Sequence, residues 1–202
     1  MEKADVSRQV PWDRVVKYTL VIIALCLGAL VPSSGWTADD RDDAGAWAAF
    51  LKAYPVFMHP RCLNCHPAGD APLQGDDSLP HAQNVQRGPE GRGKYALKCA
   101  NCHQATNLAG ENMPPGNPKW HMPPPGMRMV FEGKSPQDLC RQLKDPKQNG
   151  GLTLEELIHH VSEDKLVLWG WDHGDGRTKP PSHAEFVQSL RTWIKKGAAC
   201  PE

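Results

Sequence analysis

The chain has 202 residues, which is enough for one compact domain or two very small ones. Its 23 lysines and arginines balance its 23 aspartates and glutamates, and neither charge forms a long run. This balance argues against a nucleic-acid-binding surface and against a polybasic patch for membranes. We therefore expect no nucleic-acid partner, and a local surface for any protein partner.

The first residues have the pattern of an export signal. Arg14 and Lys17 precede an apolar stretch of 14 residues, 18–31, which Pro32 and the small residues after it end. A helix needs about 20 apolar residues to span a bilayer, so a cleaved signal is favoured over a permanent anchor. We expect residues 1–38 to be a signal peptide, its cleavage bond left open, that sends the chain to the bacterial periplasm with no stable membrane span after cleavage. The alternative is an uncleaved N-terminal anchor.

A first helix is expected directly after the signal. Residues 39–43 include four aspartates, which suit the positive end of a helix dipole. Trp47, Phe50 and Tyr54 then fall on one helical face. Because proline interrupts helices, this helix is expected to end near Pro55 and to deliver the chain into the next motif.

Two copies of one five-residue pattern carry the strongest chemical signal in the chain. They are Cys62-Leu63-Asn64-Cys65-His66 and Cys99-Ala100-Asn101-Cys102-His103. Cys-x-x-Cys-His is the attachment signature of c-type haem, in which both thiols form thioethers with the haem vinyl groups and the histidine binds iron. The sequence therefore predicts two covalently attached haems c, bound through Cys62, Cys65, Cys99 and Cys102, with His66 and His103 as proximal iron ligands.

Two other uses of these cysteines are less consistent with the sequence. A zinc site made of two Cys-x-x-Cys knuckles is one, but the 33 residues between Cys65 and Cys99 exceed the roughly 15 to 20 of a zinc ribbon. Two disulfides are the other, and they would leave His66 and His103 without a role.

The segments around the second motif are rich in glycine and proline. Residues 67–93 predict irregular backbone wrapped around a haem, with one short helix around residues 81–86, so that haem replaces much of the apolar core. Residues 112–126 contain so many prolines that neither a regular helix nor a central strand can form, and we expect a stiff loop.

These segments also supply the candidate ligands for the opposite face of each iron. His81 is our first choice for a distal ligand, assigned to the first haem; the alternative is a solvated surface histidine. For the second haem the proline-rich loop offers His121, with Met122 and Met113 as alternatives. Adjacent His121 and Met122 are not expected to bind the same face of one iron.

The C-terminal part predicts three helices, with starts at Ser135, Thr153 and Ser182. The last helix is expected to end at Gly197 and to pack near the first. Cys140 and Cys200 lie outside the haem motifs, and in an exported chain a disulfide between them is the economical interpretation; two separate buried thiols are the alternative.

The expected fold is therefore mainly α and cytochrome-c-like, with few helices, long Pro/Gly-rich loops wrapped around two covalent haems and no significant β-sheet. Residues 39–202 would form one dihaem domain, divided into a haem-binding part, 39–130, and a helical C-terminal part, 131–202.

Three stretches of the chain also resemble a known family. They are HPRCLNCHPAGDAPLQGDD, MPPGNPKWHMPPPGMRMVFEGKS and LCRQLKDPKQNGG, and they are similar to small dihaem cytochromes described as subunits of isoquinoline 1-oxidoreductase-like enzymes. The resemblance implies that the chain accepts electrons from an exported molybdenum hydroxylase. It carries over to the two cysteines and the histidine of each motif, and it fixes no distal ligand.

The leading hypothesis is therefore an exported electron-transfer protein that is not itself an enzyme. An exported dehydrogenase of the molybdenum hydroxylase type would be its donor, and a soluble cytochrome or a respiratory oxidase its acceptor. The alternative is a dihaem peroxidase-like enzyme in which one haem is five-coordinate and activates a small molecule.

Overall fold

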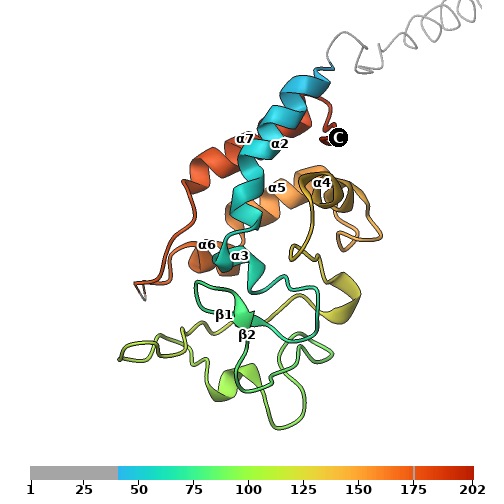
Figure 1. The fold of residues 1–202 in the computed structure, drawn as a ribbon. Coiled ribbons are helices and arrows are strands. Elements are labelled where there is room, and N and C mark those ends of the chain that lie inside the picture. Colours follow the sequence, from blue (N-terminus) through green and yellow to red (C-terminus); the bar gives the residue numbers. More distant parts are fainter. Residues whose placement is uncertain (1–40, 175) are drawn as a thin grey trace, which may run out of the picture. The chain divides into compact units, whose positions relative to one another are not determined.

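The computed structural model describes residues 41–174 and 176–202, and the predicted signal peptide, residues 1–38, lies outside the described residues. The described chain is mainly helical and contains a sheet of only two short strands (Figure 1). None of the described helices combines the length and the hydropathy that crossing a bilayer requires.

Helix α2 (Asp43–Phe57) starts at Asp42, whose side chain accepts a hydrogen bond from the backbone of Gly45. The sequence predicted an end near Pro55, but the helix continues to Phe57 with Pro55 inside it. Val56 and Phe57 are both buried in the core, so their packing compensates for the backbone hydrogen bond that proline removes. The short helix α3 (Pro60–Leu63) follows.

Residues 64–130 form mostly irregular backbone. Strands β1 (Leu73–Gln74) and β2 (Leu79–Pro80) pair antiparallel, and two short 3₁₀ turns, η2 (Cys99–Asn101) and η3 (Pro125–Met127), complete the regular structure. The helix predicted around residues 81–86 is absent from this described segment. A turn replaces it: the Asn84 amide donates to the His81 carbonyl, and Asn84 has a φ of 51°, which a right-handed helix does not accommodate.

Three C-terminal helices begin at the predicted caps. They are α4 (Pro136–Lys144), α5 (Leu154–Glu163) and α7 (His183–Lys195), capped by Ser135, Thr153 and Ser182. A fourth, α6 (Lys165–Trp171), was not predicted. Its cap is Asp164, whose carboxylate accepts from two backbone amides of the first turn and which also ends α5, so no loop separates the two helices.

The core lies among the helices. Helix α2 packs more extensively on α7 than any other two described elements pack on each other, as predicted, and the two run side by side in Figure 1. Phe50 contacts Trp193 at a ring-centroid distance of 5.2 Å, and Phe57 meets Phe186 edge to face at 5.1 Å. A disulfide between Cys140 and Cys200 joins α4 to the chain beyond α7.

The irregular segment contributes little to this core. Residues 64–130 are all described, and within them Met122 is the one buried hydrophobic side chain apart from proline. Seventeen other buried hydrophobic residues form the core cluster, and all belong to residues 46–57 or 131–199. The irregular segment is therefore shaped without an apolar interior of its own.

Candidate functional site

The first Cys-x-x-Cys-His motif is presented by helix α3. His59 caps this helix, because its Nδ1 accepts a hydrogen bond from the Arg61 amide at 3.2 Å, and Pro60 occupies the first helical position. The Arg61 guanidinium pairs with Asp76 at 2.9 Å and so ties α3 to the β1–β2 turn. The start of the helical turn that carries Cys62 is thus fixed by its cap and by an ion pair to the hairpin.

The second motif starts in the 3₁₀ turn η2. The Cys102 and His103 amides both donate to the Cys99 carbonyl, at 3.2 and 2.9 Å, which closes the motif into a compact turn. Before it, Gly93 has a φ of 90°, and a Cβ at this position would lie 2.2 Å from the Leu97 carbonyl oxygen. Only glycine therefore allows the chain to fold this closely against the start of the motif.

The two motif histidines have matching hydrogen bonds. Nδ1 of His66 lies 2.7 Å from the Met129 carbonyl oxygen, and Nδ1 of His103 lies 2.8 Å from the Pro115 carbonyl oxygen. A carbonyl oxygen can only accept, so Nδ1 is the donor in each ring and Nε2 keeps its lone pair. A histidine whose Nδ1–H is held by a backbone carbonyl is the usual arrangement for metal binding through Nε2.

An aromatic ring also stacks on each histidine. Phe131 covers the ring of His66 at a centroid distance of 4.1 Å and an interplanar angle of 17°. Trp120 covers the ring of His103 at 3.8 Å and 12°. Each imidazole is therefore fixed in orientation by a hydrogen bond at its edge and by a ring on its face.

Burial keeps both histidines neutral. It lowers the pKa of His66 to about 4, and it is also the main cause that lowers the pKa of His103. Neutral imidazole is the form that binds a metal ion, since protonation would occupy the nitrogen that has to coordinate. Near pH 7 both rings are in the metal-binding form.

Three of the four motif thiols have a pKa shifted away from the reactive thiolate form. Burial raises the pKa of Cys62 to about 12, and it is also the largest cause that raises the pKa of Cys65 and of Cys99. Catalytic Cys-x-x-Cys pairs need a lowered thiol pKa instead. All four motif cysteines are free thiols, whereas Cys140 and Cys200 are bonded to each other.

The arrangement also differs from a structural zinc site. Within the residues described, no three His, Cys, Asp or Glu side chains form a group that could hold a metal ion. A structural zinc site needs four ligands around one point. The four thiols of the two motifs are not gathered in that way.

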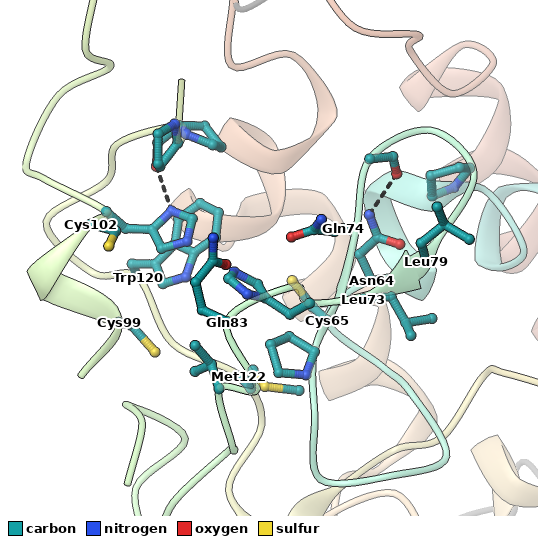
Figure 2. A pocket seen from close by; sticks show the side chains of 18 of the residues that line it. Asn64, Cys65, Leu73, Gln74, Leu79, Gln83, Cys99, Cys102, Trp120 and Met122 are labelled. Carbon is teal, nitrogen blue, oxygen red and sulfur yellow. Dashed lines mark hydrogen bonds between the residues drawn. The ribbon is translucent and has the colours of Figure 1, made fainter. Parts of the chain in front are cut away.

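Cys65 of the first motif and Cys99, Cys102 and His103 of the second line one cavity of about 720 Å³, whereas Cys62 and His66 are not among its lining residues. Figure 2 shows Cys65 on one side of this cavity and Cys99 and Cys102 on the other, with Trp120 and Met122 also lining it. The volume lies within the range of about 300 to 1,000 Å³ that is common for ligand and cofactor sites. The cavity is in the part of the chain that has almost no apolar core.

The predicted distal ligands occupy different places around this cavity. His81, His121 and Met122 all line it, and Met122 is almost fully buried. The His81 ring lies 6.4 Å from that of His103, the histidine of the second motif, although the sequence had assigned His81 to the first haem. Met113 does not line this cavity and is exposed.

Several contributors to the site were not predicted. The stacking rings are those of Trp120 and Phe131, and the carbonyl groups are those of Met129 and Pro115; all four lie outside the motif that each supports, and Phe131 and Met129 lie more than 60 residues from His66. The aromatic residues could have been noticed as candidates. The carbonyl partners could not, because every residue has a backbone carbonyl and only the folded path selects one.

Comparison of the chain with protein-family models, with curated proteins and with solved structures found no significant match.

Proposed function

We propose that this protein is an exported c-type cytochrome that holds two covalently attached haems and transfers single electrons. The observation that carries the proposal is the repeated environment of the two motif histidines. Each is neutral and has its Nδ1–H held by a carbonyl, and at least one cysteine of each motif lines the same cavity, which His103 also lines. Two separate parts of the chain therefore place a motif histidine in the same local environment.

The residues present fit the group. Cys62 and Cys65 would hold one haem, with His66 on its iron; Cys99, Cys102 and His103 would hold the other. A large apolar ring system would also supply the interior that residues 64–130 lack, since Met122 is the one buried hydrophobic side chain there apart from proline. Bound haem supplies reversible one-electron chemistry at iron.

The residues of this chain would control that chemistry through position and burial. The Met129 and Pro115 carbonyls keep the proton on Nδ1 of His66 and His103. Each imidazole is thereby a better electron-pair donor to a metal at Nε2. Phe131 and Trp120 prevent the rings from turning. Because Cys65 and Cys99 line one cavity, the two attachment sites are neighbours, a placement that suits electron exchange between them.

The partners follow from the resemblance noted in the sequence. We propose an exported molybdenum hydroxylase-type dehydrogenase as the electron donor and a soluble cytochrome or a respiratory oxidase as the acceptor. The cytochrome itself would carry out no substrate chemistry. Stopped-flow mixing with such a dehydrogenase and its substrate should reduce the haems, as followed by their absorbance bands. If no hydroxylase tried reduces them, the result counts against this donor class.

The central test is the haem content of the full chain matured in a periplasm with haem-attachment machinery. Intact mass after denaturation should show two covalent haems, and oxidised and reduced visible spectra should show both as low-spin. One high-spin haem together with turnover of peroxide would favour the peroxidase-like alternative. A chain that carries no covalent haem after such maturation would overturn the proposal.

A further inference from the structure

His81 is held at the end of the small hairpin that follows the first motif. The hairpin is anchored to that motif, because the Leu73 amide donates to the Asn64 carbonyl at 3.1 Å and the Asn64 side chain donates to Gly75. Directly after β2, the His81 amide donates to the Pro72 carbonyl at 3.1 Å. The hairpin therefore extends from the first motif and places His81 in the cavity that the second motif also lines.

The distance between His81 and His103 has a specific meaning. Their ring centroids are 6.4 Å apart, whereas Trp120, which is in stacking contact with His103, lies at 3.8 Å. Two imidazoles that bind one metal ion from opposite sides, each with a metal–nitrogen distance of about 2.0–2.1 Å, have ring centroids about 6 Å apart. The gap between His81 and His103 matches that separation.

The hydrogen bonding of His81 points the same way. Its Nδ1 is buried and has no hydrogen-bond partner. His121 has its Nδ1 bonded to the Lys119 carbonyl at 2.6 Å, the same arrangement as at His66 and His103, so the choice of His81 rests on its ring distance from His103. A buried ring nitrogen without a partner is unfavourable in a finished fold, and it indicates that the surroundings of this ring are completed by something bound in the cavity.

We infer that His81 is the second axial ligand of the haem attached at Cys99 and Cys102, on the face opposite His103. The inference rests on the proposed function and deepens it, and it replaces our sequence-based assignment of His81 to the first haem. The second haem would then be held by its own motif and by a hairpin anchored to the other motif. Because a methionine ligand raises the potential, a haem with two histidine ligands would be a weaker oxidant than one with histidine and methionine.

The experiment uses full-length protein matured in the periplasm, with one motif disabled at a time. Cys62→Ala/Cys65→Ala leaves the second haem alone, and Cys99→Ala/Cys102→Ala leaves the first. Adding His81→Ala should convert the second haem from low-spin to high-spin, and added imidazole should restore the low-spin spectrum. The same substitution should leave the first haem unchanged. His159→Ala is the matched control, because His159 is exposed on α5 and pairs with the neighbouring Glu163.

The outcomes separate this inference from the proposed function. If the wild-type protein carries two covalent haems by mass but the second haem stays low-spin after His81→Ala, the inference is overturned and the cytochrome proposal stands. A high-spin change confined to the first haem would overturn it as well. Should His81→Ala fail to mature, His81→Met keeps a ligand at this position; a new near-infrared band of methionine-bound iron on the second haem supports the inference, and an unchanged spectrum refutes it.

Discussion

The helical part of the chain, residues 41–63 and 131–202, and the loop part, residues 64–130, are stabilised in different ways. The helical part buries seventeen hydrophobic residues in one cluster and is cross-linked by a disulfide. The loop part buries Met122, a few prolines and glycines, and little else that is apolar. The helical part therefore carries its own core in its side chains, whereas the loop part needs an interior from elsewhere.

Polar contacts take the place of a core in the loop part. The Arg87 side chain is 1% exposed and donates to the Gly69 and Pro123 carbonyls, so that it joins the exit of the first motif to the proline-rich loop. The Asp70 carboxylate forms an ion pair with the Arg128 guanidinium, with a nitrogen–oxygen distance of 2.7 Å. Such contacts fix the path of a backbone but bury little apolar area, so we expect their contribution to depend on the group bound in the cavity.

Withholding haem should have the largest effect, and the effect should be confined to one part. A variant with Cys62, Cys65, Cys99 and Cys102 all replaced by alanine can be exported to the same periplasm, where the Cys140–Cys200 disulfide still forms. Hydrogen exchange should then accelerate in residues 64–130 by roughly two orders of magnitude or more, because on the proposed function the loop part loses the haems that would fill its interior. Amides of α2 and α7 should stay protected.

The wild-type protein, matured beside this variant, is the control for the exchange measurement. Equal protection of the loop part in both proteins would show that polar contacts alone suffice to order it. Loss of protection throughout, α2 and α7 included, would show that the helical part does not have an independent core.

Removing the disulfide should be the next largest effect, and it should fall on the helical part. Cys140 and Cys200 are 60 residues apart in sequence, and cross-linking a loop of that length stabilises a fold by about 4 kcal/mol on the chain-entropy model. Cys140→Ala/Cys200→Ala should therefore lower the free energy of unfolding in urea by about that amount. The haem spectra of the folded variant should match those of the wild type, and a changed haem spectrum would contradict the separation of the two parts.

Arg87→Met should give a smaller loss, and it should appear in the loop part. The substitution keeps the aliphatic volume but removes two charged hydrogen bonds to carbonyls, which we expect to cost about 2 to 3 kcal/mol. Hydrogen exchange should report the loss at Gly69 and at Met122, because residues 123–125 are prolines and have no amide hydrogen. Arg128→Met is the matched control, because Arg128 is partly exposed and its pair with Asp70 is expected to contribute at most about 1 kcal/mol.

The sequence predicted the helical part well because its signals are local. Ser135, Thr153 and Ser182 each accept a hydrogen bond from the third residue that follows, so a helix start can be recognised from four consecutive residues. Helix α6 was not predicted, because Asp164 both ends α5 and starts α6 with no loop between them. The end of α2 was placed too early, since the burial of Phe57 depends on Phe131 and Phe186, which are distant in sequence.

The sequence located the two motifs but not their surroundings, and covalent haem attachment at them stays a prediction. The Cys-x-x-Cys-His motifs can be recognised by their spacing. The position of His81 depends instead on the backbone path of residues 67–98, which is mostly irregular. That path is set by long-range backbone contacts, such as the one between the Arg87 amide and the Asp70 carbonyl, and by left-handed residues such as Asn84. No local pattern in the sequence reports these contacts.

The smallest predicted effect concerns acid stability at the junction of α2 and α7. Asp42 caps α2, and its pKa is lowered chiefly by the side-chain hydrogen bond from Lys196, next by the Gly45 amide. A carboxylate with a lowered pKa contributes stability above its unfolded pKa of about 3.9, and the contribution is lost as pH falls through the folded pKa. Asp42→Asn should therefore flatten the decline of unfolding free energy below about pH 4 in urea titrations. Lys196→Met should flatten it similarly, because it removes the largest cause of the shift, and an unchanged slope in both variants would show that acid acts on the molecule elsewhere.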